Sequence, residues 1–132
     1  MVIISHDKCS IPATVMADLL KRIFNGADTH IYESSPLDPL GHDGYSISIS
    51  PVGESSFSVN VGADEQGYSL DGLDDQNARA AVAIRDLLND TGPVIAIDVE
   101  SATYVDLVLG MDPEHFYEGW QSWDSINRDI WS

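Results

Sequence analysis

Hydrophobic and polar residues follow a helical period in two stretches of the chain. Residues 11–24 carry apolar side chains along one side, and Asn25-Gly26 follows as a stop signal, which predicts an amphipathic helix. The apolar stripe of this helix consists of Val15, Met16, Leu19, Leu20, Ile23 and Phe24. The same period predicts a second helix over residues 75–89, with Asp74 or Asp75 as its N-cap.

Between and after these helices the pattern has a period of two, which is typical of strands. Residues 45–50 read Tyr-Ser-Ile-Ser-Ile-Ser and residues 56–61 read Ser-Phe-Ser-Val-Asn-Val, so apolar side chains share one face and mostly serines the other. Further strands are predicted over residues 30–33, 67–71, 94–99 and 103–109, although the last stretch also suits a helix. This order predicts an α+β fold, an antiparallel β-sheet meander with helices packed on one face. With no linker in the sequence, residues 1–132 are expected to form a single domain.

Aromatic residues are concentrated near the C-terminus. All three tryptophans lie within residues 116–131. Their spacing predicts a helix from Pro113 to Trp131, in which Phe116, Trp120 and Trp123 share one side. That stripe is typical of a helix that docks on a sheet. Tyr117 lies off the stripe among acidic residues, and exposed aromatic rings of this kind are typical of protein interfaces.

The net charge restricts the possible binding partners more than any other property of the sequence. The chain has 22 acidic and 6 basic residues, so its formal charge is −16. This excess argues against nucleic acid or an anionic membrane as a direct partner, because both are bound through lysine and arginine. No apolar run is long enough for a membrane span, and the first residues do not suit a signal peptide. A single cysteine fits a reducing compartment, so we expect a cytoplasmic protein.

Candidate catalytic and metal-binding residues are sparse. Cys9 follows His6 closely, and His42 lies in the irregular segment 36–44, but neither has the further partners that a triad or a metal site needs. The acidic stretch 64–75 lacks the ligand order of a calcium-binding loop. Known phosphate-binding, hydrolase and metalloprotease motifs are missing. We therefore expect a non-enzymatic protein with no cofactor and no metal.

The chain resembles the immunity proteins of bacterial polymorphic-toxin and contact-dependent inhibition systems. The resemblance covers the whole chain and lies in its general character, that of a small acidic domain with a serine-rich strand meander and a tryptophan-bearing end that runs from Tyr104 to Trp120. It implies that the chain neutralises a cognate secreted toxin, commonly a nuclease or another enzyme with a cytoplasmic target.

The leading hypothesis is therefore an inhibitor that binds a basic protein partner, a cognate toxin, through an acidic surface. The predicted partner-binding residues are Asp64, Glu65, Asp71, Asp112, Glu114, Tyr117, Glu118, Trp120 and Asp124. One alternative is a small hydrolase or ligand-binding domain with a pocket between the sheet and a helix, to which His42 or Cys9 contributes. Two others are a mimic of nucleic acid and a generic acidic domain of a salt-adapted organism.

Overall fold

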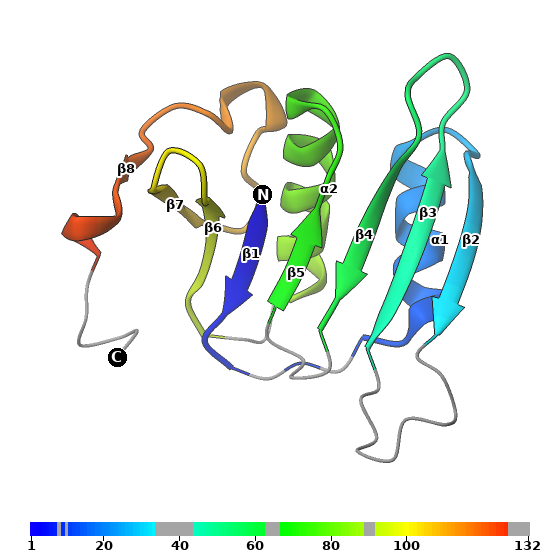
Figure 1. Cartoon of the computed structure of the whole chain (residues 1–132), viewed down its shortest axis with the longest axis horizontal. Helices are drawn as coiled ribbons and strands as arrows, with labels where there is room; N and C mark the ends of the chain where they lie inside the picture. Colours follow the sequence, from blue (N-terminus) through cyan, green and yellow to red (C-terminus); the bar gives the residue numbers. More distant parts are fainter. Residues whose placement is uncertain (8, 10, 34–43, 63–66, 89–91, 127–132) are drawn as a thin grey trace.

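The computed structural model describes residues 1–7, 9, 11–33, 44–62, 67–88 and 92–126, which form one sheet backed by two α-helices (Figure 1). The sheet has eight strands in the order β2-β3-β4-β5-β1-β6-β7-β8, and every neighbouring pair is antiparallel. The predicted α+β class is confirmed. In chain order the elements are β1 Val2–Ser5, α1 Ala13–Ile23, β2 Asp28–Glu33, β3 Tyr45–Ser50, β4 Phe57–Val61, β5 Gly67–Leu70, α2 Asp74–Leu87, β6 Val94–Asp98, β7 Thr103–Leu107, the 3₁₀ turn η1 Pro113–His115, β8 Gln121–Ser122 and the 3₁₀ turn η2 Trp123–Ser125.

Strand β1 lies in a part of the sequence for which the pattern indicated no element. It lies in the middle of the sheet, where Ile3 pairs with Tyr68 of β5 on one side and with Ala96 of β6 on the other. Ile3 is fully buried in the main core, and Ile4 packs against apolar residues on the opposite face. A strand with apolar contacts on both faces has no alternation to recognise. Because β1 separates β5 from β6, the sheet contains two continuous meanders, β2 to β5 and β6 to β8.

The main core lies between the sheet and the two helices, which cover the same face (Figure 1). The inward positions predicted for β3 and β4 are buried: Ile47, Ile49, Phe57, Val59 and Val61. Most of the predicted α1 stripe is buried as well, but Val15 is 42% exposed, so the stripe is narrower than expected. Asn25 and Gly26 both adopt positive φ, as the predicted stop after this helix requires.

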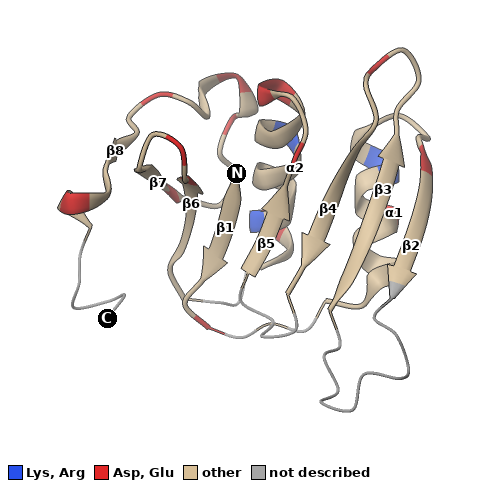
Figure 2. Ribbon diagram, in the orientation of Figure 1, with Lys and Arg blue, Asp and Glu red and all other residues tan. Residues whose placement is uncertain are grey.

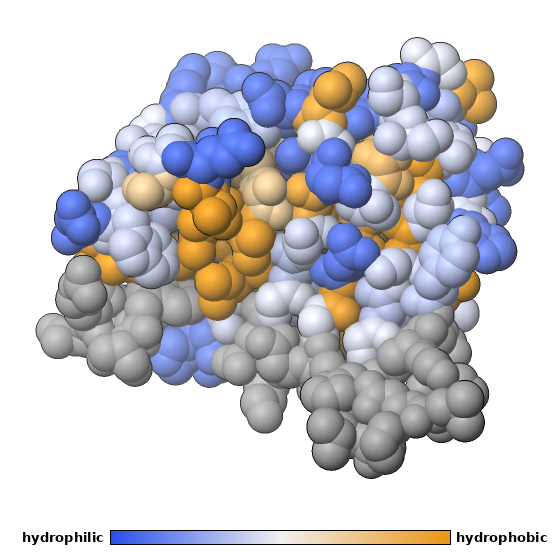
Figure 3. Space-filling view, in the orientation of Figure 1, coloured by the Kyte–Doolittle hydropathy of each residue, from blue (hydrophilic) through white to orange (hydrophobic). Residues whose placement is uncertain are grey.

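The opposite face of the sheet divides into a polar and an apolar part. Serines of β3 and β4 line the polar part, as their alternation predicted. Figure 3 views this face and shows an apolar area over β1. There a second, smaller cluster forms from Ile95, Tyr104 and Ile126, with Ile4, Ile97 and Trp123 packed against it.

The predicted C-terminal helix is wrong. The chain makes the short turn η1, passes through Gly119 at a φ of 76°, pairs with β7 as β8, and turns again at η2. Phe116 is buried in the main core, whereas Trp123 packs in the second cluster on the other face of the sheet. The aromatic spacing matched a helical stripe by coincidence, because these side chains serve two separate clusters. Residues 127–132, including Trp131, lie outside the described part of the chain.

Candidate functional site

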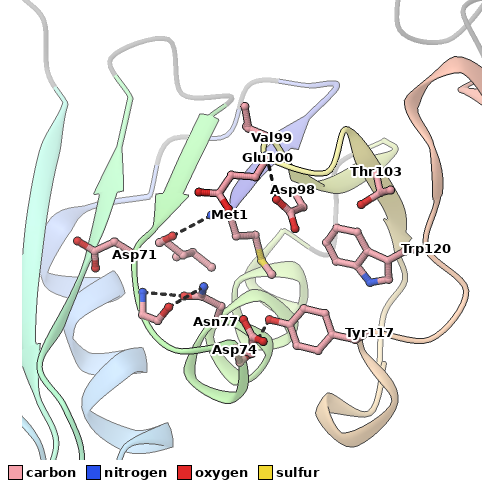
Figure 4. Close-up of a pocket in the computed structure, with 12 residues that line it drawn as sticks. Met1, Asp71, Asp74, Asn77, Asp98, Val99, Glu100, Thr103, Tyr117 and Trp120 are labelled. Atoms are coloured by element: carbon pink, nitrogen blue, oxygen red, sulfur yellow. Dashed lines mark hydrogen bonds between the residues drawn. The ribbon is translucent and has the colours of Figure 1, made fainter.

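Three segments that are distant in the sequence meet at one end of the sheet and enclose a pocket. They are the connection from β5 into α2, the turn between β6 and β7, and the segment after η1 (Figure 4). This acidic pocket has a volume of about 540 Å³. Its lining consists of Met1, Leu70, Asp71, Gly72, Asp74, Asn77, Asp98, Val99, Glu100, Thr103, Tyr117 and Trp120.

A buried asparagine fixes the connection from β5 into α2. The Asn77 side chain accepts from the Gly72 N–H at 2.9 Å and donates to the Gly72 carbonyl at 3.0 Å. A Cβ on Gly72 would lie 3.0 Å from Gln76 Oε1, so this turn leaves little room for a side chain. Gln76 Oε1 also accepts from the Leu73 N–H, which makes Leu73 the N-cap position of α2. The prediction that Asp74 or Asp75 caps this helix is therefore wrong: both lie in its first turn.

Two stacked aromatic rings form one wall of the pocket. The rings of Tyr117 and Trp120 lie 5.8 Å apart at an angle of 21°, and Figure 4 shows them side by side. Phe116, which is fully buried, meets each of these rings in an edge-to-face arrangement. The Tyr117 hydroxyl donates to the Asp74 carbonyl at 2.7 Å, and Trp120 Nε1 donates to the Phe116 carbonyl at 2.7 Å. Both rings are thus held in place by packing and by hydrogen bonds to the backbone.

Four carboxylates line the same pocket, from Asp71, Asp74, Asp98 and Glu100, and no lysine or arginine among the described residues does so. The Met1 ammonium group, which donates to the Leu70 carbonyl at 3.1 Å, is the cationic group in the lining. Within the described ranges, the lysines and arginines lie on the two helices (Figure 2). The negative charge of this end of the sheet is therefore only partly balanced.

The four carboxylates differ in their hydrogen bonds. Asp71 accepts from the Ser58 N–H at 2.6 Å and from its hydroxyl at 2.8 Å, so both of its oxygens are engaged. Asp98 Oδ1 accepts from the N–H of Glu100 at 3.0 Å and that of Ser101 at 3.4 Å. In the part of the chain that the structure describes, Oδ2 of Asp98 and the carboxylates of Asp74 and Glu100 have no hydrogen-bond donor. These oxygens are available to a cationic ligand.

The pKa of Tyr117 is raised by burial and by the negative charges around it. Burial raises this pKa to about 12, and the nearby charges of Asp74, Asp75 and Asp98 add to the increase. A negative field disfavours the phenolate because it would add another negative charge. Tyr117 therefore remains protonated at neutral pH and keeps its hydrogen bond to α2.

The structure brings only some of the predicted partner-binding residues together. Asp71, Tyr117 and Trp120 line the acidic pocket. Asp112, Glu114 and Glu118 are exposed and lie beside the pocket, in residues 112–118 around η1, here called the η1 segment. Asp124 lies on η2, beyond β8 and away from α2 (Figure 1), while Asp64 and Glu65 lie outside the described residues.

Carboxylates on the η1 segment surround a histidine. Asp112 accepts from the Glu114 N–H at 3.0 Å, as a helix-opening residue does. His115 lies 3.1 Å from a Glu118 oxygen and 3.9 Å from an Asp112 oxygen. The hydrogen bond with Glu118, together with these negative charges, raises the pKa of His115.

Sequence reasoning missed three of the four carboxylates in the pocket lining. Asp74 was considered only as a helix cap and as part of the acidic stretch 64–75, and Asp98 and Glu100 were not singled out. The sequence does contain a signal for the latter two, because Asp98 lies near the end of the predicted strand 94–99 and Glu100 directly follows that strand, where a turn is expected. Their proximity to α2 depends on β1. This strand pairs with both β5 and β6, so the turn after β6 lies one strand away from the connection between β5 and α2.

Of the other candidate residues, Cys9 is not among the described residues that line the pocket. Cys9 packs partly buried against the main core, and His42 lies outside the described residues. Among the described residues, no three His, Cys, Asp or Glu side chains are grouped as metal ligands. No helix in the described ranges combines the length and the apolar character needed to cross a membrane.

Comparisons with protein-family models, with curated proteins and with solved structures found no match to this chain.

Proposed function

We propose that this protein is an inhibitor that binds a basic protein partner, a cognate toxin, through the end of the sheet that carries the acidic pocket. The observation behind this proposal is the separation of charge. Carboxylates gather around a concave site with an aromatic wall, while the described lysines and arginines lie on the helices (Figure 2). A negative field of this kind accelerates the approach of a basic protein. Rigid tyrosine and tryptophan rings supply the apolar contact that charge alone lacks.

The surroundings of the pocket supply additional negative charge. Glu114 and Glu118 are exposed on the η1 segment, next to Tyr117 in the sequence. Their carboxylates extend the acidic area beyond the pocket and give it a rim. We expect these rim charges to influence the association rate more than the dissociation rate, because they remain accessible to solvent.

Toxin neutralisation provides the direct test. Each basic toxin domain encoded beside the gene for this chain is expressed in a sensitive host, with and without the chain, and growth is measured. We expect growth to be restored for one of them. If none of the toxins is neutralised, the proposed function is wrong.

A charge-matched pair of variants then tests the role of the pocket. The triple variant Asp74→Asn, Asp98→Asn, Glu100→Gln removes three charges from the lining. The control Asp18→Asn, Asp28→Asn, Asp106→Asn removes three exposed charges from other parts of the molecule. At low salt we expect the pocket variant to associate with the toxin about tenfold more slowly and the control to change far less. Equal slowing of both variants would contradict a localised binding surface.

A second candidate function, a binding domain for a small organic cation, is favoured by the pocket itself. A volume of about 540 Å³ lies in the range of small-molecule sites. The two functions differ in the area that they use. Glu114→Lys with Glu118→Lys should weaken binding of a protein that covers the rim, and should leave a small cation inside the pocket almost unaffected.

A further inference from the structure

We propose that the acidic pocket receives a single arginine side chain of the partner. The guanidinium group lies against the stacked rings of Tyr117 and Trp120, and its N–H groups donate to Asp98, Glu100 and Asp74. This inference rests on the proposed function and assigns the residue type that the toxin presents to the pocket.

The aromatic wall is the first reason. Because the Tyr117 hydroxyl and Trp120 Nε1 are both bonded to backbone carbonyls, neither polar atom requires a partner in the pocket. The rings therefore offer π surface to a ligand. A flat cation binds favourably against such surface, and arginine is the side chain that most often does so.

The free acceptor oxygens are the second reason. Asp98 has one oxygen without a donor, and the carboxylates of Asp74 and Glu100 are both unbonded within the described residues. Figure 4 shows the Asp98 carboxylate between Met1 and Trp120, on the inner side of the pocket. These acceptors come from two different segments, the β6–β7 turn and the first turn of α2. A guanidinium has five N–H donors in one plane and can satisfy acceptors on several sides.

The apolar part of the lining is the third reason. Leu70, which is 2% exposed, and Val99, which is 71% exposed, both line the pocket. The Met1 side chain also lines it and packs partly buried against the main core. The three methylene groups of an arginine need such contacts along their length. A lysine side chain also has an apolar stem, but its compact ammonium group gains less from a flat aromatic wall.

Titration with small model compounds followed by ¹H–¹⁵N NMR tests this inference without a toxin. The probe is N-acetyl-arginine N-methylamide, and the lysine and citrulline derivatives are the comparisons. Citrulline has nearly the same shape as arginine but no charge. The indole N–H signal of Trp120 is assigned with the variant Trp120→Phe, which keeps an aromatic ring in place.

We expect the arginine compound to shift the Trp120 signal in a saturable way, and to bind about threefold or more tightly than the lysine compound. The citrulline compound should cause no saturable shift. Equal shifts with arginine and citrulline, or no saturable shift with any compound, would overturn the inference.

Variants of the free carboxylates locate the binding site. The double variant Asp74→Asn, Glu100→Gln changes only side chains without hydrogen bonds in the described structure, so we expect it to fold normally and to bind the arginine compound about tenfold more weakly. The control Asp18→Asn, Asp28→Asn removes the same charge elsewhere and should bind normally. Equal losses in both would show a general charge effect and would overturn the assignment to the pocket.

The two proposals fail in different ways. If the chain neutralises a toxin but the model compound does not bind, the arginine assignment is wrong and the inhibitor function remains. If the compound binds in the pocket but no toxin is neutralised, the inhibitor function is wrong and the pocket remains a site for guanidinium groups.

Discussion

Two aromatic clusters lie close together in the sequence and differ in almost every physical respect. The Tyr117 cluster consists of Phe116, Tyr117 and Trp120; it packs on the main core and forms the wall of the acidic pocket. The Trp123 cluster is the second cluster, in which the Trp123 ring packs against Ile95, Tyr104 and Ile126 on the opposite face of the sheet. The comparison shows that aromatic spacing alone does not reveal which rings close a core and which ones face a ligand.

The clusters also differ in how their polar atoms are used. Tyr117 and Trp120 each make a 2.7 Å hydrogen bond to a backbone carbonyl, and carboxylates of two other segments lie around them. In the second cluster the rings of Tyr104 and Trp123 meet edge to face at 6.0 Å, and the Tyr104 hydroxyl makes a long bond of 3.4 Å to the Ser125 carbonyl. The Tyr117 cluster is thus more firmly oriented, as a binding wall needs to be.

Replacing the ring beneath the pocket should have the largest effect. Phe116 is fully buried and supports both stacked rings, so Phe116→Ala leaves a cavity in the core. We expect the free energy of unfolding to fall by about 3–5 kcal/mol. Urea denaturation measures this change. A loss below roughly 1 kcal/mol, which is closer to the effect of a surface substitution, would show that the Tyr117 cluster does not depend on its buried ring.

Removing Trp123 should have a smaller and more local effect. This ring is partly exposed and covers the smaller cluster, so Trp123→Ala should reduce the free energy of unfolding by about 1–2 kcal/mol. Because the cluster is on the other face of the sheet, the indole N–H signal of Trp120 should not move. A shift of that signal would mean that the two clusters are coupled.

Alkaline titration distinguishes Tyr117 from an ordinary exposed tyrosine. Its folded-state pKa of about 12 lies above the usual value of 10.0, so its contribution to stability is complete below pH 10 and is lost as the pH rises toward 12. Asp74→Asn with Asp75→Asn removes two of the negative charges and should lower the pKa of Tyr117. Absorbance at the phenolate band, compared with that of Tyr117→Phe, measures this value. An unchanged or higher pKa in the double variant would contradict the proposed field.

The smallest expected effect concerns His115 on the η1 segment. Glu118 raises the pKa of His115, so the protonated form stabilises this segment at low pH, and the contribution is lost as the pH rises through the raised pKa. Glu118→Gln should lower the pKa of His115, as followed by its ring proton signals in NMR. The Trp123 cluster should be unaffected over the same pH range. An unchanged pKa in this variant would mean that Glu118 does not hold the histidine.

Strands β3 and β4 and helix α1 were predictable because each of them buries a single side, which leaves a regular repeat in the sequence. The alternation in β3 and β4 and the stripe of α1 follow from burying one side of an element, and the structure confirms both. Two stretches were not predictable in this way. Strand β1 is apolar toward both faces, and the segment after Pro113 sends Phe116 and Trp123 to opposite faces while imitating a helical stripe.

The candidate site was predictable only in part, for the same reason. Tyr117 and Trp120 stood out by residue type and Asp71 by its acidic neighbours, and all three line the pocket. Asp98 and Glu100 could not be recognised as pocket residues from the sequence, because they line the pocket only through the position of the turn after β6 near α2. Asp124 had the same appearance in the sequence and lies elsewhere.

By itself the sequence determined the acidic charge, the α+β class and the elements whose buried side repeats at a fixed period, because composition and periodicity are local properties. The tertiary structure decided where the charge acts. The insertion of β1 between β5 and β6 brought carboxylates from two segments around a pair of aromatic rings from a third. The proximity of these carboxylates and rings depends on the strand order. The strand order in turn depends on which of all the possible strand pairings in the sheet are the most stable.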